Sequence, residues 1–189
     1  MRIIAGEHRG RRLQAPPGMG TRPMLDRVRE AVFSSLAPWV HEARVLDLFA
    51  GSGALGLEAL SRGAAHARFA EANQKVASLI QSNVDELGLS NRADVLCGDA
   101  LEPLFWYPEG ADLVFCDPPY PLVRSVESRK VLMAYLERLL TEGLADEGVI
   151  VLHVPRDEDV ESDLPPSERA RKDYGTTTLW LLQAPEDEE

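Results

Sequence analysis

The sequence predicts one α/β domain in which helices cover both faces of a mainly parallel β-sheet. From residue 44 onward, short apolar runs alternate with longer amphipathic runs, the pattern of strands joined by helices. A glycine-rich turn follows the first of these strands, and two apolar runs around Gly175 predict a closing antiparallel pair. The chain of 189 residues, 44% apolar and 27% charged, has the length and composition of an ordinary globular domain.

The first forty residues are predicted to form an N-terminal unit, 1–40. In 2–14 two short strand-like pieces flank a glycine-containing turn, which predicts a β-hairpin. The proline and glycine content of 15–23 predicts a loop. Apolar residues then recur at helical spacing over 25–39, with Pro38 close to the expected end of that helix.

The sheet domain is predicted to span 41–185, followed by an acidic tail, 186–189. Its helices are expected to stop at Gly63 and Gly88, because glycine often follows the last turn of a helix. The acidic, proline-bearing stretch 155–168 predicts a loop with some helix. The predicted strands are 44–49, 66–71, 93–97, 112–116, 148–154, 169–174 and 177–183; the predicted helices are 54–62, 73–87 and 128–140, with a helical turn at 101–107.

The net charge of −11 is unevenly distributed along the chain. Residues 1–30 hold seven arginines and three acidic residues, a balance of +4, so the remainder carries −15. Partner choice follows the local field, and a basic arm on an acidic body favours contact with nucleic acid, a solvated charged surface being the alternative. The candidate RNA-binding residues are Arg2, His8, Arg9, Arg11, Arg12, Arg22, Arg27 and Arg29.

Composition also restricts where the protein acts. No apolar run approaches the ~20 residues needed to cross a bilayer, and the N-terminus lacks the apolar core of a signal peptide. Cys97 and Cys116 alone do not suggest a disulfide framework. We therefore expect a cytoplasmic monomer without membrane contact, and we expect no bound metal.

A glycine-rich turn between the first strand and the first helix indicates a nucleoside site. Gly51, Gly53 and Gly56 form Gly-x-Gly-x-x-Gly, which lets the backbone approach a ligand closely. Glu71 ends the second strand, where a carboxylate can accept both hydroxyls of a ribose. Asp47 discriminates between ligands, because a carboxylate beside this turn repels a pyrophosphate but attracts the ammonium and sulfonium of S-adenosyl-L-methionine. We therefore predict S-adenosyl-L-methionine as the cofactor.

Three further residues are predicted to bind this cofactor. Asp99 and Ala100 follow the third strand, where the Asp99 carboxylate can accept from the adenine amino group, cap a helix, or do both. Phe49 lies in the glycine-rich segment and is either a wall of the pocket or part of the core.

Asp117-Pro118-Pro119-Tyr120 follows the fourth strand, at the edge where open α/β sheets bind ligands. An amino group conjugated to an aromatic base is a poor nucleophile, because its lone pair is delocalised into the ring. The Asp117 carboxylate and the Pro118 carbonyl can accept its two N–H bonds and turn the lone pair toward a sulfonium methyl. Tyr120 can stack on the base. The four residues are therefore predicted to be the reaction centre.

These motifs resemble those of a known group of enzymes. Asp47-Leu-Phe-Ala-Gly-Ser-Gly together with Asp117-Pro-Pro-Tyr resembles the class I amino-methyltransferases of nucleic acids. Arg2-Ile-Ile-Ala-Gly-Glu-His-Arg-Gly-Arg-Arg-Leu, Thr21-Arg-Pro-Met-Leu-Asp-Arg-Val-Arg-Glu and Tyr174-Gly-Thr-Thr-Thr-Leu-Trp-Leu resemble the RsmD family. The resemblance covers nearly the whole chain.

The resemblance to RsmD implies a Rossmann-like class I fold. Its sheet has seven mainly parallel strands with an antiparallel last strand, preceded by an N-terminal hairpin and helix. The resemblance also implies methylation of N2 of guanine 966 in 16S rRNA, within an assembled or partly assembled 30S subunit. Met24 and His153 depart from the family, which usually has threonine and often an acid at these positions. We expect His153 to line the pocket or the core.

Other functions share parts of this pattern. An adenine-N6 methyltransferase acting on RNA or DNA uses the same Asp-Pro-Pro-Tyr chemistry, although a DNA enzyme normally needs a further recognition domain. A protein glutamine methyltransferase usually has Asn before Pro-Pro-Tyr. Asp47 argues against an NAD-dependent oxidoreductase, and the intact glycine-rich turn argues against an RNA-binding protein without activity.

Overall fold

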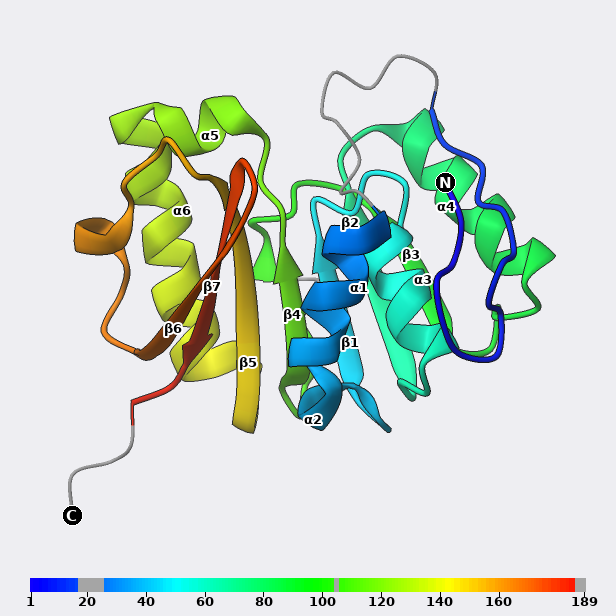
Figure 1. Ribbon diagram of the computed structural model, residues 1–189. Coiled ribbons are helices and arrows are strands. Elements are labelled where there is room, and N and C mark those ends of the chain that lie inside the picture. The colour runs from blue at the N-terminus through cyan, green and yellow to red at the C-terminus, as the bar shows by residue number, and fades with distance from the viewer. Residues whose placement is uncertain (17–25, 104–105, 186–189) are drawn as a thin grey trace.

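The computed structural model describes residues 1–16, 26–103 and 106–185. Figure 1 shows a single sheet in the middle of the molecule, with strands in the order β3-β2-β1-β4-β5-β7-β6. The strand β7 runs antiparallel to both of its neighbours, and all other neighbouring pairs are parallel. The strands are β1 (Arg44–Leu48), β2 (His66–Glu71), β3 (Ala93–Cys97), β4 (Ala111–Cys116), β5 (Leu144–Pro155), β6 (Glu168–Tyr174) and β7 (Thr177–Gln183). The predicted fold is confirmed.

Helices cover both faces of the sheet because successive strand residues point to opposite faces. Val45 and Phe115 pack with α1 (Asp26–Ser35), α2 (Ala37–Val40), α3 (Ala54–Ser61) and α4 (Gln74–Glu86). Leu46 and Val114 pack on the other face, with α5 (Tyr120–Arg124), α6 (Val126–Arg138) and the π-helical turn η2 (Leu139–Gly143). A 3₁₀ turn, η3 (Glu161–Asp163), lies in the acidic stretch that we expected to hold some helix.

Several elements differ from their predicted bounds. The single helix expected over 25–39 is divided at Leu36 into α1 and α2, since Pro38 lies at the start of α2 and cannot donate a backbone hydrogen bond. The helix α5 was not predicted, although Pro121 in its first turn is a common start signal. The strand β5 begins four residues before its predicted start, beyond a register shift between Ala111 and Leu113 of β4. The predicted turn at 101–107 lies partly outside the described residues.

The predicted N-terminal hairpin is present as one antiparallel bridge, between Arg2 and Arg12, instead of two strands. The amides of Ile3, Gly10 and Leu13 donate to carbonyls of the opposite arm. The amides of Ile4 and Ala5 instead donate to the Glu58 carboxylate of α3, at 2.8 and 3.0 Å. The turn itself lies against the end of α3, where the Glu7 amide donates to the Ser61 carbonyl. The hairpin strands therefore cannot pair with each other along their whole length.

The N-terminal segment is part of the same packed structure as the sheet. Ile3 and Leu13 are buried in the first core cluster, and Gln14 exchanges two hydrogen bonds with Asn83 of α4. Figure 1 shows the segment running beside α3 and α4. The division at residue 40 stays a prediction, as does the separate tail, which lies outside the described residues.

Candidate active site

One cavity of about 490 Å³ opens at the carboxyl ends of the parallel strands, a size typical of small-molecule sites. The strands β1, β2, β3 and β4 all end at this edge because they are parallel. The cavity brings together ten of the predicted cofactor and reaction-centre residues: Asp47, Phe49, Gly51, Glu71, Asp99, Ala100, Asp117, Pro118, Pro119 and Tyr120. Residues not predicted as cofactor or reaction-centre residues also line it, among them Met1, Ser52, Ala72, Arg29 and His153.

Glu71 and the glycine-rich turn are joined directly. The Gly51 amide donates to Oε2 of Glu71 at 2.9 Å, and the Asn73 amide donates to Oε1 at 2.8 Å. Phe49 and Gly51 have φ of 58° and 56°, in the left-handed region, so the chain turns sharply as it leaves β1. The turn therefore holds the Glu71 carboxylate at the cavity wall, where it can accept from ribose hydroxyls.

Gly51 lines the cavity but Gly53 and Gly56 do not, so contact of these two glycines with the cofactor stays a prediction. A Cβ on Gly56 would lie 2.4 Å from the Phe69 ring, and a Cβ on Gly53 would lie 2.9 Å from Ile80. These two glycines allow α3 to pack closely on the sheet, whereas Gly51 faces the ligand space.

Asp47 is an acid in an apolar setting. Its side chain is 1% exposed and accepts the Gly56 amide at 2.9 Å. Burial raises the pKa of the Asp47 carboxyl to about 8, and the nearby charges of Asp117 and Glu71 contribute to the rise. A cavity with three carboxylates and an up-shifted acid is suited to a ligand that carries positive charge. Among the residues that the structure describes, no group of three or more His, Cys, Asp or Glu side chains is arranged to hold a metal ion.

Asp99 has both of the features that we considered for it. Its Oδ1 accepts the Leu101 amide at 3.0 Å, as a cap of the following turn, and the residue also lines the cavity. Ala100 beside it is buried in the second core cluster and forms part of the same wall.

The motif predicted to be the reaction centre, Asp117-Pro118-Pro119-Tyr120, lies where β4 ends. The Asp117 side chain is 42% exposed, and its Oδ2 accepts no hydrogen bond from the described residues. The Pro118 carbonyl likewise accepts none from them, whereas the Pro119 carbonyl accepts the Leu122 amide of α5. Tyr120 is 39% exposed, and the Arg124 guanidinium lies 5.6 Å from the centre of its ring. Two residues that line the cavity thus each have an acceptor without a hydrogen bond from the described residues, beside an exposed aromatic ring.

His153, which we expected to line the pocket or the core, lines the cavity and also contacts the reaction centre. Its Nδ1 lies 2.6 Å from Oδ1 of Asp117, and its Nε2 lies 3.1 Å from Oγ1 of Thr177. Sequence reasoning missed this contact, since its only signal was the position of His153 near the end of the fifth strand.

The N-terminal arginines divide into exposed and buried groups. Arg9, Arg12 and Arg27 are exposed and form no ion pair with the described residues, and exposed Arg11 donates to the Glu86 carbonyl. Arg2 is exposed but pairs with Asp26, and the His8 side chain, in contact with Glu7, is 13% exposed. Arg22 and Met24 lie outside the described residues.

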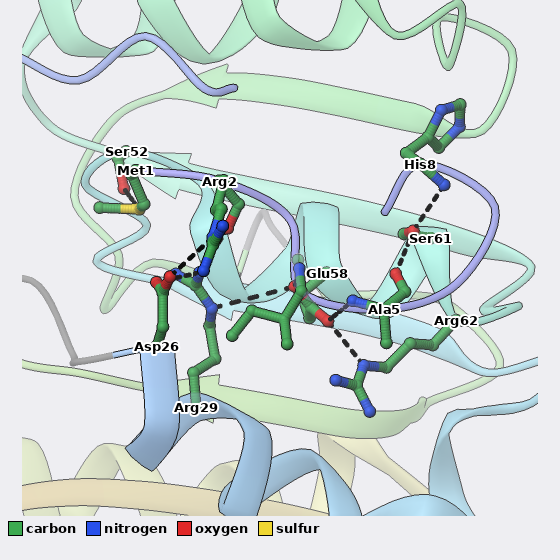
Figure 2. A network of polar contacts seen from close by, with 12 residues as sticks. Met1, Arg2, Ala5, His8, Asp26, Arg29, Ser52, Glu58, Ser61 and Arg62 are labelled. Carbon is green, nitrogen blue, oxygen red and sulfur yellow. Dashed lines mark hydrogen bonds and ion pairs between the residues drawn. The ribbon is translucent and has the colours of Figure 1, made fainter. Parts of the chain in front are cut away.

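The prediction that Arg29 binds RNA is wrong, because the residue is 1% exposed and its side chain does not lie on the outer surface with the other arginines. Figure 2 shows its guanidinium within a buried network, where Nη2 donates to the Arg2 carbonyl and to Asp26 and Nε lies 3.9 Å from Glu58. Burial lowers the pKa of Arg29, and the neighbouring charges of Glu58 and Asp26 oppose that shift. Arg29 therefore fastens the N-terminal segment to α1 and α3.

The order of the sheet, the glycine-rich turn with Glu71, and the acid-lined cavity define a class I S-adenosylmethionine-dependent methyltransferase. Within that class, the chain belongs to the RsmD family, whose model, described as conserved hypothetical protein 95, matches residues 1–183. The predicted family and the predicted cofactor are confirmed. No helix in the described part of the chain has the length and apolar character to cross a membrane.

The chain is similar to proteins from several bacteria. It is 41% identical over 167 residues to ribosomal RNA small subunit methyltransferase D of Escherichia coli strain K12, covering 87% of this chain and 78% of that protein. The structure of a hypothetical protein from Thermus thermophilus has 32% identity and a TM-score of 0.73, over 97% of this chain and 99% of that chain. The T. thermophilus 16S rRNA N2 G1207 methyltransferase RsmC shares the fold alone, at 20% identity and a TM-score of 0.70, over 89% of this chain and 45% of that chain.

Proposed function

We propose that this protein transfers a methyl group from S-adenosylmethionine to the exocyclic N2 of a guanine in 16S ribosomal RNA. The observation that carries the proposal is the position of Asp117-Pro118-Pro119-Tyr120 at the end of β4, on the cavity that also holds Glu71. The name of the E. coli relative, a ribosomal RNA small subunit methyltransferase, supports the choice of RNA. The family resemblance suggests guanine 966 and an assembled or partly assembled 30S subunit as the substrate.

The two free acceptors at the reaction centre fit a planar amino group. The Oδ2 of Asp117 and the Pro118 carbonyl accept its two N–H bonds, so that the nitrogen lone pair points out of the base plane and toward the methyl donor. The cofactor supplies an electrophilic methyl group on its sulfonium. As the N–C bond forms and the S–C bond breaks, the nitrogen becomes cationic and strongly acidic, and the Asp117 carboxylate takes its proton.

The exposed arginines of the N-terminal segment provide the contact with the RNA backbone. Arg9 and Arg12 have no acidic partner among the described residues, so their charge is available to phosphates. Most of the affinity of such arms comes from phosphate neutralisation and does not depend on sequence. Selection of the base is therefore assigned to the cavity and to Tyr120, which stacks on the base.

The test is tritium transfer from labelled S-adenosylmethionine onto 30S subunits that lack the modification, followed by digestion and nucleoside mapping. We expect label in N2-methylguanosine at one position, and slower labelling of naked 16S RNA. The Asp117→Ala variant serves as the control and should lose transfer while still binding the cofactor in calorimetry. Label in N6-methyladenosine would instead support the adenine-N6 alternative. Methyl transfer by Asp117→Ala would contradict the proposed role of Asp117 in the reaction.

A further inference from the structure

Three neighbouring strand ends bring Asp117, His153 and Thr177 into one row at the rim of the cavity. Asp117 follows β4, His153 lies near the end of β5, and Thr177 begins β7. Because β5 is parallel to β4 and antiparallel to β7, the ends of β4 and β5 meet the start of β7 at the same sheet edge. The row is thus a product of the strand order.

The hydrogen bonds in this row have a defined direction. A carboxylate only accepts, so the bond of 2.6 Å between Asp117 Oδ1 and His153 Nδ1 carries its proton on the imidazole. In a neutral imidazole, Nε2 then has a lone pair, and it accepts the Thr177 hydroxyl proton across 3.1 Å. A hydroxyl can donate or accept, so Thr177 is compatible with this tautomer, and it is the acceptor-only carboxylate of Asp117 that selects it.

The imidazole of His153 donates to the Asp117 carboxylate, which is otherwise free to rotate. The last torsion of an aspartate side chain has broad minima, and Asp117 is 42% exposed, whereas the imidazole of His153 is 14% exposed. A short hydrogen bond to a charged oxygen is among the stronger ones in proteins. Bonding at Oδ1 fixes the plane of the carboxylate and leaves Oδ2 open toward the cavity.

We propose that His153 is a positioning residue, which holds the Asp117 carboxylate so that Oδ2 accepts an N–H bond of the target amino group. This inference rests on the proposed function, since it assigns to Asp117 the role of acceptor for that group. The backbone of His153 is held independently of its side chain by the antiparallel register with Leu179 of β7. Replacing the imidazole therefore leaves the strand in place and changes mainly the orientation of Asp117.

Two matched substitutions of His153 distinguish the role of Nδ1 from the role of Nε2. In His153→Asn the side-chain amide lies where Nδ1 lies and still donates to Asp117, whereas in His153→Gln it reaches toward Thr177 and no longer does so. We expect His153→Gln and His153→Ala to lower kcat by about 100-fold, the effect of misplacing a reacting group. The KM for 30S subunits and the Kd for S-adenosylmethionine should stay within about 2-fold, because neither substrate binds to His153 in this proposal. His153→Asn should recover most of the lost kcat.

The matched control is His66→Gln, at the amino end of β2 and far from the cavity edge, which should leave kcat unchanged. Thermal unfolding of each variant shows whether it is folded. Equal kcat for the folded Asn and Gln variants would overturn the proposal, as would a loss confined to KM. Absence of methyl transfer by the wild-type protein would instead contradict the proposed function.

A second measurement does not depend on activity. Long-range ¹H–¹⁵N NMR spectra of protein labelled in its four histidines report which ring nitrogens carry a proton, and His153→Gln identifies the signal. We expect a protonated Nδ1 in His153, and we expect it also in Thr177→Val, because the Asp117 carboxylate selects the tautomer. An unprotonated Nδ1 in the wild-type protein would overturn the proposal, because His153 could then not donate to Asp117.

Discussion

The carboxylates of the cavity have different tasks because their surroundings differ. Both oxygens of Glu71 already accept backbone amides, so this side chain is fixed in place. Asp47 is buried and Asp117 is half exposed, with one oxygen bonded to His153. We therefore expect Glu71 and Asp117 to supply negative charge to a cofactor whose sulfonium and ammonium are both cationic, and Asp47 to add its charge only when it ionises.

The raised pKa of Asp47, about 8, predicts that cofactor binding depends on pH. At pH 7 the empty protein holds a proton on Asp47, and a cationic ligand favours the ionised form, so S-adenosylmethionine binding should release a proton and strengthen toward pH 8. Calorimetry in two buffers of different ionisation enthalpy measures this release. Asp47→Asn is the control and should release none; equal proton release by both proteins would contradict the assignment.

The same shift affects the stability of the protein without cofactor. The folded pKa of about 8 exceeds the ordinary value of 3.8, so the folded state keeps a proton that the unfolded state loses. The contribution of Asp47 to the free energy of unfolding is therefore fully present below pH 4 and is lost as the pH rises toward 8.

At the level of elements, α3 organises the N-terminal segment. Glu58 of this helix is fully buried, accepts the amides of Ile4 and Ala5, and pairs with Arg62 at 2.7 Å. Ser61, at the end of the helix, accepts from the backbone of His8 and donates to the Ala5 carbonyl. Polar groups of α3 thus hold the middle of the arm that we propose for RNA binding (Figure 2), and α1 and α4 hold its two ends.

Two glycines of the N-terminal turn test this attachment. Gly6 and Gly10 have φ of 82° and 84°, but a Cβ on Gly6 would lie 1.7 Å from the Ser61 carbonyl oxygen, whereas a Cβ on Gly10 meets nothing within 4 Å. We expect Gly10→Ala to lower the free energy of unfolding by about 1–2 kcal/mol, the cost of left-handed backbone. Gly6→Ala should cost about 3 kcal/mol or more, since the turn must also move off α3. Denaturant unfolding measures both, and equal losses would show that the turn does not depend on this contact.

At the level of the whole molecule, a basic arm is attached to an acidic body. The net charge of −11 disfavours RNA in general, so we expect association through the surface that carries Arg9, Arg11 and Arg12. This arrangement restricts the orientation in which an RNA can approach, and the cavity opens beside the same N-terminal segment, since Met1 and Ala15 line it.

Changing Arg9, Arg11 and Arg12 together to Gln should weaken RNA binding and flatten its dependence on salt. Each lost phosphate contact lowers the slope of log K against log salt by about 0.7–0.9, so three lost contacts lower it by about 2. Fluorescence anisotropy with a labelled 16S fragment at several salt concentrations measures the slope. The matched control changes Arg138, Arg169 and Arg171, which are exposed on α6 and the far edge strand β6. An equal change in both variants would place the RNA surface elsewhere.

Local patterns were sufficient to predict most elements of this fold. These elements depend on residues that are neighbours in sequence. The structure has the alternation of strands and helices, the helix ends before Gly63 and Gly88 and the closing pair around Gly175 at or near the predicted positions. The predictions were poorer where backbone donors find distant partners. The hairpin is one example, since the amides of Ile4 and Ala5 donate to Glu58 of α3, which is distant in the chain.

By itself, the sequence determined the fold and the cofactor, because glycine-rich turns act through short-range geometry that the order of residues contains. It also predicted the reaction centre at Asp-Pro-Pro-Tyr, which stays a prediction. Only the tertiary structure decided that Arg29 is buried and that His153 touches Asp117. The residues of both contacts come from elements far apart in the chain. Their proximity depends on strand order and helix packing, which place side chains together regardless of their separation in sequence.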